Sequence, residues 1–199
     1  SSVVEGLAAS IENSTIRWLG AIAAVLVTVM LRGRMLRLLR TSNARVGAAN
    51  DRFSATVQAL VATAVLAAPM PLAAFLAGTL LRGTIDAGPV GAIGEAMLAV
   101  VGLVALLHFL LRLCAAGGVA EVHFRWPPVV RSALARSAWV LLLFAMPPLV
   151  ICFTAIRTDE KSGGGALARW SMILCLLVMA AVSVRLFSPR RGIFAPLIE

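Results

Sequence analysis

The sequence predicts an all-α membrane domain that crosses the bilayer about five times. Apolar residues make up 60% of the chain, whereas soluble domains usually contain about 45–50%. The mean hydropathy is +0.95, and the apolar residues form long runs that end at clusters of arginine. A soluble chain of 199 residues has no interior large enough for so much apolar surface, so we expect these runs to lie in lipid.

Five segments between the charged clusters are candidate transmembrane helices. A span needs about 20 residues, and the uncharged runs of the first and fifth segments are shorter than that. Both runs end at arginines, whose side chains can reach the headgroups and supply the missing length. We therefore expect a single helical membrane domain over residues 1–199, with spans at about 16–32, 53–81, 88–112, 136–156 and 168–186.

The distribution of charge between these segments predicts their orientation. If the N-terminus is periplasmic, 13 of the 18 lysines and arginines fall on the cytoplasmic side, and six of the nine acids fall on the periplasmic side. Short loops rich in Lys and Arg stay in the cytoplasm. We therefore expect a periplasmic N-terminus and a cytoplasmic C-terminus.

Four arginines follow the first apolar run closely: Arg32, Arg34, Arg37 and Arg40. In one interpretation the first helix continues along the inner leaflet, and these side chains contact anionic lipid headgroups at about 1 kcal/mol per basic residue. In the other they only anchor the topology. The basic residues of a nucleic-acid-binding domain gather on one face, whereas these lie between apolar runs. We therefore expect the lipid bilayer, and not nucleic acid, as the partner.

Two pairs of prolines interrupt the predicted spans. Pro69 and Pro71 lie in the second span, and Pro147 and Pro148 lie in the fourth. Proline removes a backbone donor and clashes with the preceding turn of a helix. We expect a kink in the outer half of each span, either as a simple bend or as a hinge that responds to membrane shape.

The titratable residues do not form a recognisable catalytic or metal site. Glu121, His123 and His108 lack the spacing and the partners of a zinc site, and no nucleophile motif is present. Glu95 is the one acid within an apolar run, and we place it at headgroup level in preference to a proton or ion site. We therefore expect neither an enzyme nor a bound cofactor or metal.

Three stretches together resemble a known family. They are NARVGAANDRFSATVQALVATAVLAAPMPLAAFLAGTLL (Asn43–Leu81), GGVAEVHFRWPPVVRSALARSAWVLL (Gly117–Leu142) and LFSPRRGIFAPLIE (Leu186–Glu199). The most specific part is the motif His123, Phe124, Arg125, Trp126 and Pro127. The sequence is similar to the inner-membrane region that precedes the channel core in large MscS-like mechanosensitive channels of the MscK/MscM type.

The resemblance implies a peripheral, tension-sensing helical domain in the bacterial inner membrane. Such channels look like homo-heptamers that release ions and small solutes on hypo-osmotic shock. Their pore helix and cytoplasmic vestibule lie in the remainder of the channel chain, so the resemblance transfers no pore residue to this sequence. We expect these 199 residues to be a segment of a longer protein.

Two other functions remain open from the sequence. Half of a secondary transporter would need intramembrane charge or broken helices that meet at mid-bilayer, and only Glu95 and the proline pairs favour it. A structural membrane anchor or assembly domain is indistinguishable from a tension sensor by sequence.

Overall fold

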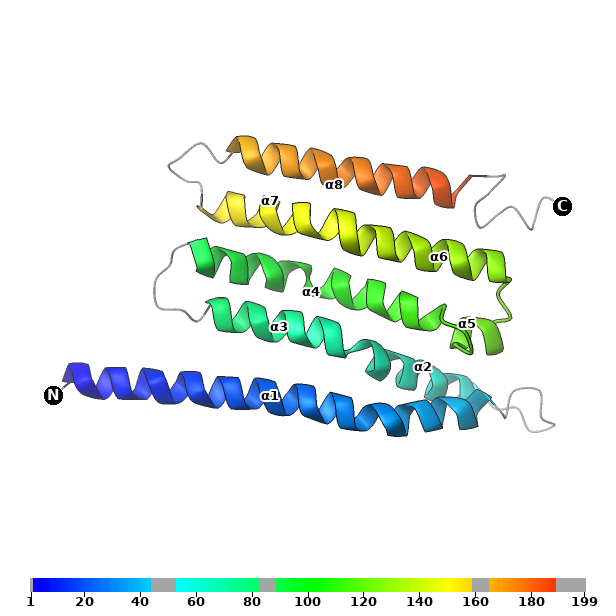
Figure 1. The fold of residues 1–199 in the computed structure, drawn as a ribbon, viewed down its shortest axis with the longest axis horizontal. Coiled ribbons are helices and arrows are strands. Elements are labelled where there is room, and N and C mark those ends of the chain that lie inside the picture. The colour runs from blue at the N-terminus through cyan, green and yellow to red at the C-terminus, as the bar shows by residue number, and fades with distance from the viewer. Residues whose placement is uncertain (1, 44–52, 83–88, 159–164, 189–199) are drawn as a thin grey trace.

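Five antiparallel helical segments lie side by side in chain order (Figure 1). The computed structural model describes residues 2–43, 53–82, 89–158 and 165–188, which contain helices and turns but no strand. The elements are α1 (Ser2–Asn43), α2 (Phe53–Ala67), α3 (Pro69–Arg82), α4 (Pro89–Leu113), α5 (Val119–Val122), α6 (Pro128–Val140), the π-helical turn η1 (Leu141–Ala145), α7 (Met146–Thr158) and α8 (Gly165–Leu186). The predicted all-α class is confirmed for these residues.

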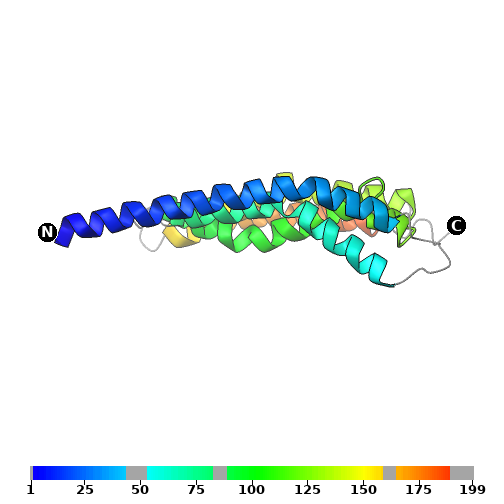
Figure 2. The same ribbon diagram turned by 90° about the horizontal axis from the view of Figure 1, so that it is seen from below.

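Apart from α2, which leaves the plane, the helices form a layer about one helix thick, as the view along its edge shows (Figure 2). α1 contacts α2 and α3, α4 lies between α3 and α7, and α8 packs against α7. The chain exposes 13,003 Å², whereas a compact soluble protein of 20.9 kDa exposes about 9,000 Å². Such a layer buries only limited clusters between its helices, such as the one that contains Val100, Leu107 and Met146, and many large apolar side chains of the described residues remain on its surface.

Small residues form the contacts between neighbouring helices. The buried side of α2 includes Ala55, Ala59 and Ala62, and the buried side of α8 includes Ala168, Ser171 and Cys175. These positions recur every three or four residues, so they lie on one face of each helix. Small side chains let helix backbones approach closely, which is how membrane helices gain packing energy without a hydrophobic driving force between them.

The second predicted span is bent by 44° at Ala68, between α2 and α3. Pro69 begins α3, and Pro71 follows in its first turn. The two prolines lack the N–H groups that would bond the preceding turn, whereas Leu72 donates normally to the Ala68 carbonyl at 2.9 Å. The bend lies just past the middle of the predicted span 53–81, at the two prolines where a kink was expected.

The fourth predicted span is part of a continuous helix of 31 residues, from Pro128 to Thr158. It begins eight residues before the predicted start at 136. Within it, η1 ends directly before Met146, Pro147 and Pro148. The Met146 N–H bonds to the Leu141 carbonyl, five residues back, as in a π-helix. The wider turn is the local adjustment that accompanies these two prolines.

Three described helices are long and apolar enough to cross a membrane: Val90–Leu113, Pro128–Thr158 and Gly165–Leu186. The bent pair of α2 and α3 is a fourth if it forms one span. The first predicted span, 16–32, lies inside the longer helix α1. Several of its side chains, including that of Trp18, lie outside the described set, so its crossing stays a prediction.

Candidate functional site at the basic end of the helix layer

The alternating helix directions bring most of the described arginines to one end of the layer. This end, here called the basic end, holds the C-terminus of α1, the start of α2, the end of α4, α5, the start of α6 and the end of α8 (Figure 1). Its described basic residues are Arg32, Arg34, Arg37, Arg40, Arg112, Arg125, Arg131, Arg136 and Arg185. The four predicted lipid contacts of α1 therefore share an end with the His123–Pro127 motif.

The turn between α4 and α6 has a backbone that depends on glycine. Gly117 has a φ of +69°, which is the left-handed region that closes many helices. At Gly118, a Cβ would lie 2.6 Å from the Leu113 carbonyl oxygen. Arg125 also has a positive φ, of 52°, and the following Trp126 N–H donates to the Ala120 carbonyl at 2.8 Å. The chain thus folds back on the end of α4 before α6 begins.

The motif within this turn packs on the neighbouring helices. The Thr56 hydroxyl of α2 lies 3.1 Å from Nδ1 of His123. Trp126 packs against a buried cluster that includes Ala59 and Val119, and Leu39 of α1 packs against the same cluster. Trp126 therefore contacts protein. The motif joins α1, α2 and α4 to the start of α6.

An ion pair holds the two sides of this turn together. Glu121 Oε2 accepts hydrogen bonds of 2.8 Å from the Gly117 N–H and from Nη1 of Arg131. The hydrogen bond from the Gly117 N–H is the main cause of a lowered pKa of Glu121; partial loss of water opposes it, and the charge of Arg131 and its hydrogen bond lower the pKa further. The carboxylate is therefore ionised at neutral pH, and it neutralises a side chain of Arg131 that is only 14% exposed.

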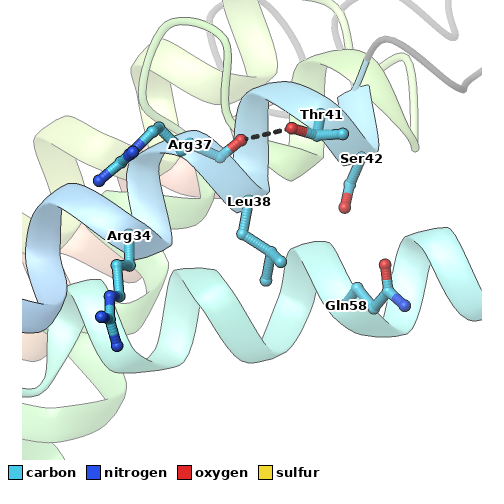
Figure 3. Close-up of a pocket in the computed structure, with 6 residues that line it drawn as sticks. All are labelled: Arg34, Arg37, Leu38, Thr41, Ser42 and Gln58. Atoms are coloured by element: carbon cyan, nitrogen blue, oxygen red, sulfur yellow. Dashed lines mark hydrogen bonds between the residues drawn. The ribbon is translucent and has the colours of Figure 1, made fainter.

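A groove opens between α1 and α2 at the same end. It is an open groove of about 490 Å³, lined by Arg34, Arg37, Leu38, Thr41, Ser42 and Gln58 (Figure 3). Figure 3 shows Arg34 and Leu38 extending from α1 toward α2, whereas Arg37 lies along α1. Arg32 and Arg40 are also exposed but do not line the groove. The four predicted lipid contacts are thus divided into two pairs.

Glu95 lies at the opposite end of the layer, between two arginines. Its carboxylate oxygens are 3.6 Å from Nε of Arg82 and 3.3 Å from Nε of Arg157. The three residues come from α3, α4 and α7, so the acid links three neighbouring helices. A third of its side chain is exposed, as suits a headgroup-level acid more than a buried ion site.

Other candidate chemistry is not brought together among the described residues. No group of three His, Cys, Asp or Glu side chains there has the geometry to hold a metal ion. Cys114, Cys152 and Cys175 are free and buried, as expected for small apolar residues.

Several partners that the structure reveals carry no signal in the sequence. Thr56, Ser42 and Gln58 carry no motif, and their roles depend on how α1 and α2 are placed against each other. Arg82 and Arg157 were identifiable, because the predicted topology already puts both on the same side of the membrane as Glu95.

The chain is similar to a described family of membrane domains and to a curated channel protein. Residues 15–199 match the family described as "Mechanosensitive ion channel inner membrane domain 1". The chain is 26% identical over 171 residues to the "Miniconductance mechanosensitive channel MscM" of Escherichia coli (strain K12). That alignment covers 84% of this chain and 15% of the relative, so the chain spans about one seventh of the relative's length. No solved structure matches.

Proposed function

Because the chain belongs to the mechanosensitive ion channel inner membrane domain 1 family, and so forms a multi-pass inner-membrane domain, we propose that it senses membrane tension for an MscS-like channel. The channel as a whole would release ions and small solutes on hypo-osmotic shock. The pore would belong to the remainder of the chain, and these helices would lie around it, in a homo-heptamer as the family resemblance implies.

The observation that carries this proposal is the single layer of helices. The apolar residues 172–174 and 176–177 of α8 are all exposed. Because successive residues of a helix point 100° apart, α8 presents apolar side chains in most directions around its axis. Such a layer contacts lipid on both faces. Tension does work in proportion to the change in membrane area, and a wide lipid-contacting layer around a pore increases the area that can change.

In the proposed membrane placement, the basic end faces the cytoplasm. The chain would cross at 16–32, 53–81, 88–112, 136–156 and 168–186, with a periplasmic N-terminus and a cytoplasmic C-terminus. α1 has 42 residues and is about 63 Å long, whereas the hydrocarbon core is about 30 Å thick. It would therefore extend beyond both headgroup regions, with its arginines at the inner one.

The bend and the π turn supply the deformable parts of this proposal. Pro69 and Pro71 lie at the 44° bend, and Pro147 and Pro148 follow η1. Backbone hydrogen bonds are fewer at both places, so we propose that a change in bilayer thickness is absorbed there first.

A patch-clamp measurement on the whole channel tests the proposal. Removal of residues 16–186 should raise the tension needed for opening, because the pore loses the surrounding area that couples it to the bilayer. The intact channel should also open at a tension that depends on lipid acyl-chain length, and the deletion should remove this dependence. Unchanged opening tension in both experiments would leave these helices the role of a structural anchor.

The transporter alternative has little support in the layer. The bend at Ala68 is the kind of broken helix that lines transporter sites, but residues 53–81 contain no charged side chain. Glu95 lies at an end of the layer and is paired with two arginines.

A further inference from the structure

We propose that the groove between α1 and α2 binds the phosphodiester headgroup of an anionic glycerophospholipid, with an acyl chain lying along α2. The proposal rests on the membrane placement given above, in which the basic end meets the inner leaflet. It goes further than a general attraction of arginines to lipid, because it assigns one lipid to Arg34 and Arg37 and excludes Arg32 and Arg40 from the site.

The size and shape of the groove suit a headgroup. Its volume of about 490 Å³ lies within the usual range of about 300–1,000 Å³ for small-molecule sites. The groove is open and lies between two helices that a lipid can approach from the side. α2 leaves the plane of the layer beside the end of α1 (Figure 2), which separates the two helices at this point.

The charge of the groove selects an anion. Arg34 and Arg37 are three residues apart, so they lie on the same side of α1. No acid of the described ranges lines the groove, and the sequence contains no Asp or Glu from 13 to 50, with Asp51 the next acid along the chain. Among the described residues, neither guanidinium has an ion-pair partner. Two uncompensated arginines suit a phosphate, to which a guanidinium can donate two parallel hydrogen bonds.

The hydrogen-bonding groups of the groove are arranged around these arginines. Thr41 donates its hydroxyl to the Arg37 carbonyl at 2.8 Å, so it serves the helix (Figure 3). Nε of Arg37 donates weakly to the Gly33 carbonyl at 3.4 Å, which leaves the two terminal nitrogens of that guanidinium for a ligand. Gln58 adds an exposed amide from α2, which suits the glycerol or ester oxygens of a lipid.

Exposed apolar side chains in and beside the groove offer a path for an acyl chain. Val61 lies one helical turn after Gln58 on α2, and its side chain is 55% exposed. Leu38 of α1, in the groove wall, is also exposed. A free phosphate ion would use only the arginines, whereas a phospholipid would use the arginines and this path. The presence of both surfaces is why we assign a lipid.

The experiment compares two double variants of the whole channel that lose the same charge. R34Q/R37Q removes the arginines of the groove, and R32Q/R40Q removes the two outside it. Dioleoylphosphatidylglycerol is titrated into each detergent-solubilised channel, and the lipids retained per chain are counted by native mass spectrometry. Dioleoylphosphatidylcholine, which has no net charge, and inorganic phosphate serve as comparison probes.

We expect R34Q/R37Q to bind phosphatidylglycerol at least tenfold more weakly than R32Q/R40Q. Q58L, which changes no charge, should weaken binding several-fold and provides a test if the arginine variant does not fold. Equal losses in the two double variants would overturn the site, since general electrostatic attraction predicts about the same loss of affinity for each arginine. Equal retention of phosphatidylcholine, or displacement of the lipid by millimolar inorganic phosphate, would also overturn it.

These results are separable from the tension-sensing proposal. Lipid retention is measured without opening the channel. Even if removal of residues 16–186 leaves gating unchanged, the full-length channel can still retain the lipid at this groove. Conversely, R34Q/R37Q could lose lipid binding without a change in opening tension. That result would not contradict the proposal that the whole layer senses tension.

Discussion

At Gly94, the absence of a side chain is what allows α4 to touch α3. A Cβ at this position would lie 2.5 Å from the Arg82 backbone nitrogen and 2.7 Å from the Gly78 carbonyl oxygen. These are backbone atoms, which cannot turn aside as the end of a flexible side chain can. The contact between the two helices therefore depends on this residue more than on the apolar character of its neighbours.

We expect Gly94→Ala to destabilise the domain by about 1–3 kcal/mol, the usual cost of overpacking. The measurement is the thermal unfolding midpoint of the detergent-solubilised channel, followed by fluorescence-detected size exclusion. Gly102→Ala is the matched control in the same helix, because nothing lies within 4 Å of a Cβ there and alanine favours a helix more than glycine does. An equal effect of both substitutions would contradict the close approach of α3 and α4.

Glu121 provides a pH dependence at the scale of a single ion pair. Its pKa is lowered from the ordinary value of 4.5, first by the Gly117 N–H and then by Arg131. A lowered pKa in the folded state means that the ion pair stabilises the turn above pH 4.5. That contribution is lost as the pH falls through the lower, native pKa.

We therefore expect E121Q to unfold at a lower temperature than the wild type at pH 7, and the difference to shrink as the pH is lowered toward 3. Thermal midpoints of both proteins across this range check the prediction. Since other carboxylates titrate equally in the two proteins, the comparison isolates Glu121. A difference that stays constant with pH would mean that Glu121 acts by packing and not by charge.

At the scale of elements, the two proline pairs have different consequences. Pro69 and Pro71 accompany a bend of 44°, whereas Pro147 and Pro148 follow a π turn inside a continuous helix of 31 residues. The sequence predicted a kink at both pairs from the same rule. The rule identifies missing hydrogen bonds but not whether the chain responds by bending or by widening one turn, which depends on the helices packed alongside.

Replacing Pro69 and Pro71 by alanine should straighten α2 relative to α3. Given the lengths of the two helices, removing the bend would lengthen the distance between residues 53 and 82 by about 3 Å. Spin labels at Phe53→Cys and Arg82→Cys in a cysteine-free, spin-diluted channel would measure it. The same labels with P147A/P148A are the control and should report no change. An unchanged distance in P69A/P71A would show that α1 and α4 impose the bend.

Much of the element pattern was predictable from the sequence, because apolar runs ended by arginines mark helix ends in lipid. Residues 53–81 and 88–112 fall within one or two residues of the helical bounds. The helix that contains the fourth predicted span begins earlier than the span, at Pro128, and includes Arg131 and Arg136. Arg131 is accommodated by Glu121, which comes from another element. The groove was unpredictable for a similar reason: Gln58 and Ser42 acquire a role only when α2 leaves the plane beside α1.

For the whole molecule, the arrangement is a layer of antiparallel helices with different chemistry at its two ends. One end carries the groove, the Glu121–Arg131 pair and most of the described arginines. The other carries Glu95 with Arg82 and Arg157. Charge at the ends and apolar residues between them suit a layer that stands across a bilayer, and the tension-sensing proposal needs that placement to be right.

Cysteine labelling of the two ends tests this placement most directly. In a cysteine-free full-length channel, Thr158→Cys reports the end with Glu95, and Ala116→Cys, an exposed position in the turn after α4, reports the basic end. A membrane-impermeant maleimide added to spheroplasts should label position 158 at once and position 116 only after the membrane is permeabilised. Labelling of both positions from the same side would contradict the transverse placement of the layer and the tension-sensing proposal that depends on it.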